Sequence, residues 1–454
     1  MPHCFDSNGN KIILEDPPIA SSGEGKVSKT NCKIKGKRQL AKLYHQNTRT
    51  PERIAKLRLL TQNPAADPNA GKGHISFAWP QSLLFDHQKN IVGFLMSEIP
   101  GKNLVTICSP KLRQKNKLSI DWLFLHTVAL NIASIIEAIH QYRPYQYVLG
   151  DIKLENILVN NQALPSIIDV DSFQVSAPRS RKRFHCLVGS EGFTPPELFG
   201  KDFKKEIQYP EQDYFRLGVV IYYLLFGEHP FQGIWTGQGE PPDKNQLVRQ
   251  GFWPYAPQNR RFIQVSKRTI PLTILHPQLE QCFLQCFNDG HDNPSQRPKD
   301  EDWVKALEAA LGELEQCDQV DSHWYSRRYG DCYWCERARD LKIDIFPEII
   351  SFNLLERFLN KKDWKQADLE TKVLLLKLTK GQTKSWLNEQ SIQSIEVKSL
   401  EELDRLWRKA SNDHFGFSIQ KQIYLQTGNQ LDQYNSQNYQ KFGEQVGWWD
   451  KTTN

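Results

Sequence analysis

A short stretch around Asp151 combines side chains that a phosphoryl-transfer reaction needs. Asp151, Lys153 and Asn156 lie within residues 149–159, and Asp169 follows shortly after. The carboxylate of Asp151 can accept the proton of an attacking hydroxyl, and the ammonium group of Lys153 can lie beside the transferring phosphoryl group. Asn156 and Asp169 offer oxygen ligands to Mg²⁺, which neutralises the charge of the phosphates. The spacing therefore predicts a phosphoryl-transfer site with bound magnesium.

Two segments upstream of this block can hold nucleotide phosphates. In residues 19–27, the small side chains around Gly23 and Gly25 let backbone N–H groups approach phosphate oxygens, and Val27 can pack on an adenine ring. Lys42 follows an apolar alternation, which predicts a strand carrying a lysine whose buried stem needs an anionic partner. Each feature also has an ordinary alternative: a plain hairpin turn for the glycines and a surface position on an edge strand for the lysine.

The order of these segments resembles the eukaryotic-type protein kinases. The resemblance implies a bilobal fold in which Asp151 positions the substrate hydroxyl and Lys42 grips the α- and β-phosphates of ATP. It also implies that Met96 lies at the back of the adenine pocket and that backbone groups of Ser97 and Ile99 hydrogen-bond the base. The expected ligands are ATP and Mg²⁺, and the expected substrate is a protein hydroxyl.

Residues beyond the catalytic block extend the resemblance over about 280 residues. The segment 189–197 matches the end of an activation segment, where Ser190 falls at the position of a hydroxyl that hydrogen-bonds the catalytic Asp and Lys. In the same family pattern, Glu197 pairs with Arg297 inside the second lobe. Asp213 holds the backbone of the catalytic loop from a buried helix.

Three departures from the family pattern leave the activity open. Leu149–Gly150 replace the usual His-Arg, so no clamp for a phosphorylated activation loop is expected, and Asp171 replaces the glycine that normally ends the motif begun by Asp169. The acid that should pair with Lys42 is unclear, with Glu52 as the candidate. The altered motifs resemble an atypical bacterial branch of Ser/Thr kinases. An active kinase is the first reading, and a catalytically dead nucleotide-binding scaffold is the alternative.

Four residues of metal-binding types follow the last helix of the kinase-like region. Cys317, His323, Cys332 and Cys335 form the pattern C-x5-H-x8-C-x2-C. Soft ligands with one C-x2-C hook suit a closed, structural Zn²⁺ site. The alternative is a chance grouping of reduced side chains. Similar short Cys/His segments follow the kinase domain in the bacterial branch that the altered motifs resemble.

The last hundred residues change to a helical pattern and carry a second resemblance. The segments 403–407, 415–420 and 442–448 are similar to the tetrapyrrole-binding family called genomes-uncoupled four, accessory proteins of magnesium chelatase in oxygenic phototrophs. The resemblance implies an all-α domain that binds a porphyrin, protoporphyrin or Mg-protoporphyrin, and has tetrapyrrole-synthesis proteins as partners. The combination with a kinase indicates a cyanobacterial-type architecture.

A porphyrin needs a wide apolar palm and cations for its propionates. The sequence offers candidates for both. The candidate palm residues are Phe415, Phe417, Ile423, Tyr424 and Trp448, and the candidate cations are Arg408, Lys409 and Lys421. The alternative for each aromatic side chain is an ordinary core position. Trp449-Asp450 replaces the family's usual basic residue after the final Gly-Trp, so this point offers no cation to a propionate.

Length and composition fit a multidomain α+β protein. The 454 residues are enough for two to four domains. The two resemblances imply a kinase-like domain over 1–312, with lobes at about 12–100 and 101–312, and a helical domain over 341–454, and the Cys/His pattern predicts a zinc knuckle over 313–340. The apolar stretch 128–139 is too short for a membrane span and predicts a buried helix. The nine cysteines cluster only near the end of the sequence, at Cys317, Cys332 and Cys335, which favours a cytoplasmic protein without disulfides. The first 60 residues carry a local charge of +7, which accounts for the whole net charge of +6. Contact with nucleotide phosphates explains this charge better than nucleic-acid binding does, and a solvated basic face is the plain alternative.

Overall fold

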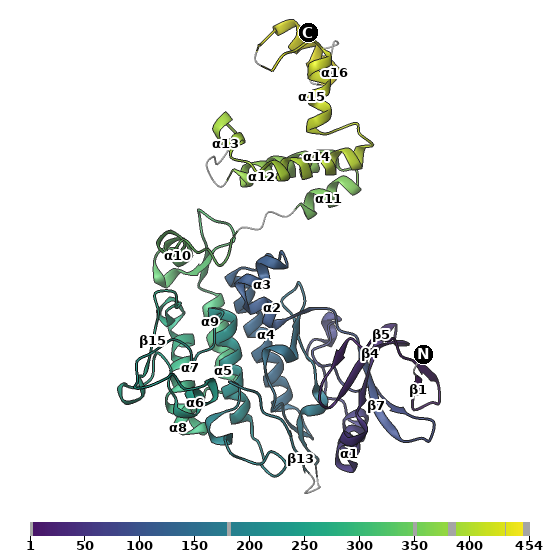
Figure 1. Ribbon diagram of the computed structural model, residues 1–454, viewed down its shortest axis with the longest axis vertical. Helices are drawn as coiled ribbons and strands as arrows, with labels where there is room; N and C mark the ends of the chain where they lie inside the picture. Colours follow the sequence, from purple (N-terminus) through teal and green to yellow (C-terminus); the bar gives the residue numbers. More distant parts are fainter. Residues whose placement is uncertain (1–2, 179–182, 348–351, 380–386, 432, 448–454) are drawn as a thin grey trace. The chain divides into compact units, whose positions relative to one another are not determined.

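The computed structural model forms two compact units, Met1–Pro347 and Glu348–Asn454 (Figure 1). It describes residues 3–178, 183–347, 352–379, 387–431 and 433–447. Each unit has its own hydrophobic core and is described by itself.

The first lobe of the N-terminal unit is an antiparallel sheet of seven strands in the order β2-β1-β6-β7-β5-β4-β3. Helix α1 (Pro51–Gln62) packs on it through Leu57, which shares a buried cluster with Tyr44 and Phe94. The helix begins where Thr50 accepts a hydrogen bond from the N–H of Arg53. The strands are β1 (His3–Phe5), β2 (Lys11–Ile13), β3 (Ala20–Ser21), β4 (Gly25–Ile34), β5 (Lys37–Tyr44), β6 (Ser82–Phe85) and β7 (Ile91–Ser97).

The second lobe is built on helices that share the largest core of the molecule. Helix α5 (Pro210–Phe226) is apolar nearly all round, as a central helix must be, and packs between α4 (Trp122–Gln141) and α7 (Pro277–Phe287). The other helices of this lobe are α2 (Leu104–Cys108), α3 (Pro110–Lys115), α6 (Lys244–Gln250), α8 (Asp289–Asp292) and α9 (Asp300–Leu311), with a short hairpin of β14 (Ile234–Trp235) and β15 (Ile263–Gln264).

Helix α4 is long and apolar enough to cross a membrane by length and composition alone. Its apolar side chains already have partners inside this lobe, because Val128, Ile132 and Ile136 are fully buried against the surrounding helices. The core therefore accounts for this composition, as the sequence predicts for residues 128–139.

Two small antiparallel sheets support the loops between the lobes. Strand β10 (Ile157–Val159) lies between β8 (Lys102–Asn103) and β11 (Pro165–Ile167). Strand β12 (Gln174–Ser176) lies between β9 (Gln146–Val148) and β13 (Arg183–Phe184). The first sheet fixes the end of the catalytic loop, and the second fixes its beginning and the start of the activation segment.

The Cys/His segment packs as part of the N-terminal unit. It contains the hairpin β16 (Leu314–Gln316) and β17 (Trp324–Ser326), followed by α10 (Tyr333–Leu341). Trp334 is buried, and its ring meets that of Trp122 edge to face at 5.1 Å. The segment is therefore attached to the second lobe through its core.

The C-terminal unit is helical. Leu355, Leu374, Leu403 and Leu406 form its core, and Trp407 donates a 2.9 Å hydrogen bond to the hydroxyl of Thr371. Its helices are α11 (Asn353–Asn360), α12 (Trp364–Leu378), α13 (Glu389–Gln393), α14 (Val397–Ser411), α15 (Phe417–Gln426) and α16 (Ser436–Gln445).

Candidate active site and metal centre

Asp151 lies at the centre of a compact polar group. The Ser190 hydroxyl donates to Oδ1 of Asp151 at 2.6 Å, and Nζ of Lys153 donates to Oδ2 at 2.7 Å. Lys153 also reaches the Ser190 hydroxyl at 3.0 Å. The Asp151 side chain is only 3 % exposed, and these partners satisfy its buried oxygens. This is the arrangement of Asp151, Lys153 and a hydroxyl that the resemblance to the protein kinases implies for Ser190.

The loop that carries Asp151 is fixed from below by Asp213. The backbone N–H groups of Leu149 and Gly150 donate to its two carboxylate oxygens at 2.6 and 2.9 Å, as predicted. His140 and Arg216 complete the coordination of this buried carboxylate at 3.1 and 3.0 Å. Burial alone would raise the pKa of Asp213, but these donors lower it.

Gly150 shows why the loop differs from the family pattern. Its backbone has a φ of +73°, and a Cβ at this position would come within 2.6 Å of the Cys186 side chain. Cys186 of the activation segment therefore occupies the space that the family's arginine would need at position 150. The clamp that this arginine provides for a phosphorylated activation loop has no room to form.

The predicted buried ion pair of the second lobe is also present. The Arg297 guanidinium makes two hydrogen bonds of 2.7 Å to the Glu197 carboxylate, and its own side chain is fully buried. Arg297 also donates to the backbone oxygens of Gly290 and Glu211. The pair therefore ties the end of the activation segment to α5 and α8.

Lys42 binds two carboxylates, and neither belongs to α1. Its Nζ donates to Asp169 and, at 2.8 Å, to Asp171. Glu52, the candidate partner from the sequence, is exposed on the first turn of α1, so that assignment is wrong. Burial opposes the charge of Lys42, but the two carboxylates raise its pKa above the ordinary value. Sequence reasoning noted Asp171 as a departure and missed that it is the partner.

Asn156 and Asp169 lie on adjoining segments, as a shared metal site requires. The N–H of Ile168 donates to the backbone oxygen of Asn156 at 2.8 Å. Both hydrogen bonds of the Asn156 amide nitrogen go to Asp151, which leaves the amide oxygen as the ligand atom. The Asp169 side chain is 31 % exposed, so it is accessible to a metal ion. Its oxygen and that of Asn156 are donors that Mg²⁺ prefers.

The glycine-rich loop has the form of a hairpin between β3 and β4. Gly25 is required there, because a Cβ would lie 2.2 Å from the backbone oxygen of Leu43. Gly23 has open space around it, and Val27 is half-buried opposite Lys42 in the register of β4 and β5. The hairpin thus brings Val27 beside the lysine, while an adenine contact stays a prediction.

The residues expected around the base follow one another along β7 and the connection between the lobes. Met96 is half-buried against the cluster of Tyr44 and Phe94, Ser97 ends β7, and Ile99 follows in the connection. Their contacts with a nucleotide base stay predictions.

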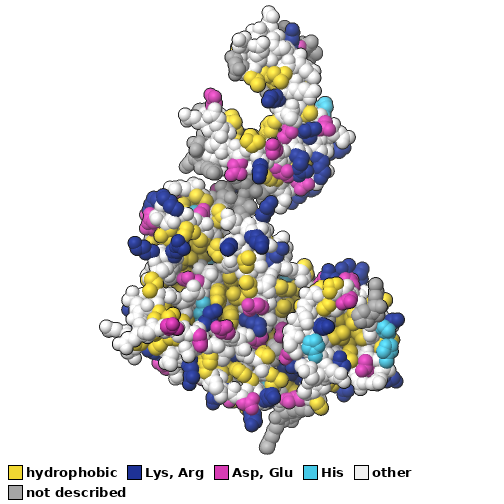
Figure 2. Space-filling view, viewed as in Figure 1, with side chains coloured by type: hydrophobic (Ala, Val, Ile, Leu, Met, Phe, Trp, Pro, Cys, Tyr) yellow, Lys and Arg dark blue, Asp and Glu magenta, His cyan; other side chains and the backbone are white. Residues whose placement is uncertain are grey.

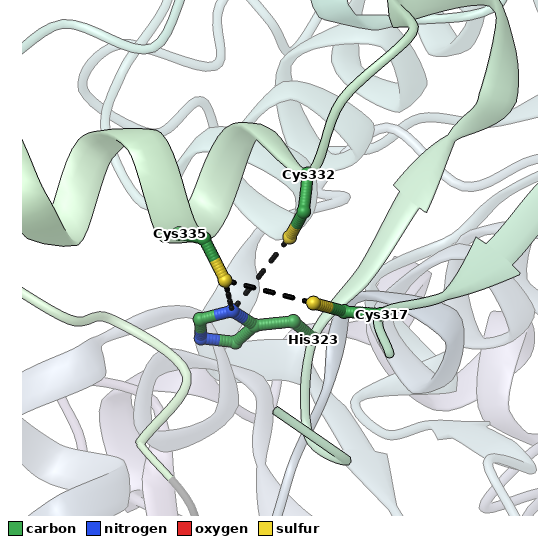
Figure 3. Close-up of side chains that lie close together, drawn as sticks. All are labelled: Cys317, His323, Cys332 and Cys335. Carbon is green, nitrogen blue, oxygen red and sulfur yellow. Dashed lines mark hydrogen bonds between the residues drawn. The ribbon is translucent and has the colours of Figure 1, made fainter. Parts of the chain in front are cut away.

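The four cysteine and histidine ligands predicted for zinc come together (Figure 3). Their ligand atoms all lie within 4.8 Å of one another. Cys317 follows β16, His323 precedes β17, and Cys332 and Cys335 open α10. Nδ1 of His323 faces the sulfurs, with Cys335 at 3.3 Å, while Nε2 lies 3.2 Å from a carboxylate oxygen of Asp344.

This environment fits a tetrahedral zinc site. Burial would raise the pKa of the Cys332 thiol, but hydrogen bonds from His323 and the neighbouring cysteines lower it to about 7. A thiolate is the form that binds zinc. A carboxylate on the far nitrogen of a ligating histidine is the usual support of such a ligand, and sequence reasoning missed Asp344 in this role.

The predicted porphyrin-binding surface of the C-terminal unit consists of aromatic side chains that are partly exposed and partly packed against neighbouring rings. Phe415 and Phe417 are each 39 % exposed, and the Phe415 ring meets those of Trp364 and Trp407 at 5.4 and 6.0 Å. Figure 2 shows hydrophobic side chains in the hollow of this unit. An accessible aromatic surface of this kind suits a flat macrocycle.

Other candidates in the C-terminal unit have different surroundings. Tyr424 packs against Phe442 at 5.3 Å, which makes it part of the contact between α15 and α16. Arg408 hydrogen-bonds Asp413 at 2.6 Å, so its charge already has a partner. Ile423 is half-buried, and Lys409 and Lys421 are exposed. Trp448 lies outside the described residues.

The two-lobed fold, with Lys42 on β5, the Asp151 loop and the Glu197–Arg297 pair, is that of a protein kinase domain. Comparison with known proteins agrees: residues 84–273 match the protein kinase domain, and residues 347–454 match the GUN4-like family. The chain therefore combines a protein kinase domain with a GUN4-like domain.

Individual relatives support the same two parts. The protein kinase YegI of Escherichia coli strain K12 is 30 % identical over 337 residues, which are 73 % of this chain and 49 % of YegI. The uncharacterized protein ycf53 of Cyanidium caldarium is 31 % identical over 99 residues, 21 % of this chain and 38 % of ycf53. The chain spans about half the length of YegI.

Proposed function

We propose that this protein transfers the γ-phosphate of ATP to serine or threonine hydroxyls of another protein. The single observation that carries the proposal is the hydrogen-bonded group of Asp151, Lys153 and Ser190. It combines a buried general base, a cation for the phosphoryl oxygens and a hydroxyl that orients both.

Each residue has a separate part in the reaction. Asp151 accepts the proton of the substrate hydroxyl as its oxygen bonds to the γ-phosphorus, and the bond from that phosphorus to ADP breaks. Lys153 stabilises the charge on the transferring group, and Lys42 holds the remaining phosphates. Asn156 and Asp169 would hold Mg²⁺, which neutralises phosphate charge when bound.

The direct test is phosphate incorporation from labelled ATP and Mg²⁺ by the full chain, using itself and a general acceptor protein, either acidic casein or basic histone, as acceptors. Incorporation on serine or threonine that disappears in Asp151→Asn and Asp169→Ala is the expected result. Glu155→Gln is the matched control, because Glu155 lies exposed in the same loop. Equal incorporation in all four proteins would trace the signal to a contaminating kinase and reject the proposal.

A nucleotide-binding scaffold is the second candidate. The observation in its favour is that both Asp169 and Asp171 bind Lys42, so the lysine and the metal ligand neutralise each other. ATP binding without transfer, under Mg²⁺ and under Mn²⁺, would favour this candidate over the kinase.

We further propose that Cys317, His323, Cys332 and Cys335 hold one structural zinc ion. The short distances among the four ligand atoms and the contact of His323 with Asp344 support this assignment. The protein purified without added metal should contain about one zinc per chain by atomic emission. A zinc content near zero in protein that is folded and reduced would reject it.

For the GUN4-like domain we propose binding of a porphyrin, protoporphyrin or its magnesium complex, with effects on phosphoryl transfer. The exposed rings of Phe415 and Phe417 support a macrocycle site. Quenching of tryptophan fluorescence by added porphyrin should saturate in the natural protein and weaken in Phe415→Ser. Lys398→Ser, an exposed change on α14, is the control. If saturating porphyrin leaves both ATP affinity and phosphorylation rate unchanged, the proposed coupling is wrong.

A further inference from the structure

The carboxylates that balance the charge of Lys42 lie at the start of the activation segment and not on helix α1. Lys42 is buried on β5, where an ammonium group must have an anionic partner. The side chains of α1 beside it are basic: Arg53 lies over the Tyr44 ring at 5.0 Å, and Lys56 is buried. Arg53 is itself paired with Glu24 of the glycine-rich hairpin. The helix next to the lysine therefore presents positive charge.

Asp171 supplies the missing negative charge and uses both of its oxygens to do so. It lies 2.8 Å from Nζ of Lys42 and accepts a 2.6 Å hydrogen bond from the Tyr44 hydroxyl. Lys42 and Tyr44 are alternate residues of β5, so their side chains share one face of the sheet. Asp171 thus contacts two side chains of the first lobe from a segment of the second lobe.

The two aspartates that bind Lys42 differ in exposure. The Asp171 side chain is 5 % exposed, whereas that of Asp169 is 31 % exposed. The buried carboxylate is enclosed by Lys42, Tyr44 and the neighbouring α1. The exposed carboxylate remains accessible to a metal ion. Asp171 can therefore hold Lys42 while Asp169 faces the metal ion. If Asp169 were the only carboxylate, it would have to bind both the lysine and the metal.

The backbone around Asp171 is anchored in the second lobe. Asp171 lies in a 3-10 turn, Val170–Ser172, between the fully buried side chains of Val170 and Phe173. The Phe173 ring meets Phe77 edge to face at 6.4 Å. A carboxylate on this turn has a fixed position relative to the catalytic loop, which a carboxylate on α1 would not have.

We propose that Asp171 is the positioning residue for Lys42, taking the place of an acid on α1. Asp171 holds the ammonium group toward the nucleotide phosphates and shares its charge with Asp169, so that Asp169 is not the only anion that balances Lys42. The position of Lys42 then depends on the start of the activation segment and is independent of any acidic side chain of α1. The inference rests on the proposed use of Lys42 in nucleotide binding.

The test compares nucleotides that differ only in their phosphates. Binding of adenosine, ADP and ATP with Mg²⁺ is measured by calorimetry for the full natural chain, Asp171→Asn and the control Glu52→Gln. We expect Asp171→Asn to weaken ADP and ATP binding about tenfold, with adenosine affinity within about twofold, because only the lysine–phosphate contact is affected. Glu52→Gln should bind all three like the natural chain.

A double-mutant cycle separates positioning from general disruption. If Asp171 acts through Lys42, Asp171→Asn should cause no further loss of ADP affinity in a Lys42→Met background. The Mg²⁺ concentration for half-maximal ATP binding should also rise in Asp171→Asn, since Lys42 then pairs with Asp169 alone. Tyr44→Phe, which removes one hydrogen bond to Asp171, should weaken ADP binding about threefold and serves if Asp171→Asn does not fold.

The outcomes separate the two proposals. Unchanged ADP affinity in Asp171→Asn, or in Tyr44→Phe if the former is unfolded, would overturn the role of Asp171. An equal loss for adenosine and ADP, or additive effects with Lys42→Met, would do the same. If Asp171→Asn weakens ADP binding but the natural chain transfers no phosphate, the positioning role of Asp171 is supported and the kinase activity is rejected. A natural chain that binds no nucleotide would overturn both.

Discussion

The hydroxyl of Ser190 donates a 2.6 Å hydrogen bond to the carboxylate of Asp151. This contact joins the end of the activation segment to the catalytic loop across 39 residues of sequence. Since Lys153 reaches both groups, the bond orients the predicted base and the predicted cation together. An activation segment that moves away would disturb both.

Replacing Ser190 tests that relationship. Ser190→Ala removes the donor to Asp151 and a contact of Lys153, so kcat should fall by about 10- to 100-fold with ATP affinity unchanged. Ser190→Thr keeps the hydroxyl and should retain most of the activity. Steady-state phosphorylation rates over a range of ATP concentrations measure both quantities. A Thr variant as inactive as the Ala variant would show that the hydroxyl is not the relevant group.

His140 should make stability depend on pH near neutrality. It lies between Asp213 and Asp300, and although burial opposes its charge, hydrogen bonds to both carboxylates raise its pKa to about 9. A raised pKa means that the stabilisation is present below the unfolded pKa, near 6.5, and is lost as pH rises toward 9. Between pH 7 and pH 9, the natural chain should lose on the order of 2 kcal/mol from this group.

Urea unfolding at pH 7 and pH 9 checks this expectation. His140→Gln should remove most of the pH-dependent loss. His126→Gln is the control on the same helix, because burial lowers the pKa of His126 to about 4 and the ring is neutral at both pH values. If His140→Gln and His126→Gln have the same pH dependence, His140 is not charged in the folded protein.

The Glu197–Arg297 pair should contribute strongly to folding. Arg297→Met leaves Glu197 without its bidentate partner and removes two further bonds to backbone oxygens. Breaking one partner of a buried pair costs about 3 to 5 kcal/mol. The control is Arg260→Met, whose partner Asp292 is 65 % exposed, with a cost below about 1 kcal/mol. Chemical denaturation measures both, and equal costs would contradict the structural role of the buried pair.

Much of the site could be predicted because its residues lie on short, ordered motifs. Asp151, Lys153 and Asn156 occupy one loop, and Ser190 and Glu197 occupy one segment, so the spacing within each motif places its members together, and the resemblance to the protein kinases implies which motifs meet. The contacts of Asp151 with Ser190, of Glu197 with Arg297 and of Asp213 with the catalytic loop are confirmed.

The partner of Lys42 could not be found in this way. Asp171 lies 129 residues away and replaces a glycine, so its role depends on how closely the two lobes approach. The available signal was the composition of α1: its one acid, Glu52, lies on the first turn, and the following turns carry Arg53 and Lys56, which offer Lys42 no carboxylate. Asp344 was missed for a similar reason, since a carboxylate outside the Cys/His pattern has no fixed spacing from its histidine.

Removal of zinc should weaken the kinase domain itself. The predicted ligands lie on a segment whose Trp334 is buried against Trp122 of α4, and the buried Arg113 of α3 donates to the backbone oxygen of Ile345 at 3.1 Å. Without the metal, β16, β17 and α10 lose the link that closes them, so these core contacts should loosen as well. Chelation should therefore lower the unfolding midpoint of the N-terminal unit and not only disorder a peripheral hairpin.

Cys332→Ser tests this coupling in the absence of a chelator. The variant should contain less than about 0.1 zinc per chain and lose at least about 3 kcal/mol of unfolding free energy. Cys32→Ser on β4 is the control, because Cys32 lies outside the cluster and should leave the zinc content unchanged. Loss of zinc with an unchanged unfolding midpoint would show that the packing of Trp334 is sufficient to hold the segment. In that case, the metal would stabilise only the hairpin around its own ligands.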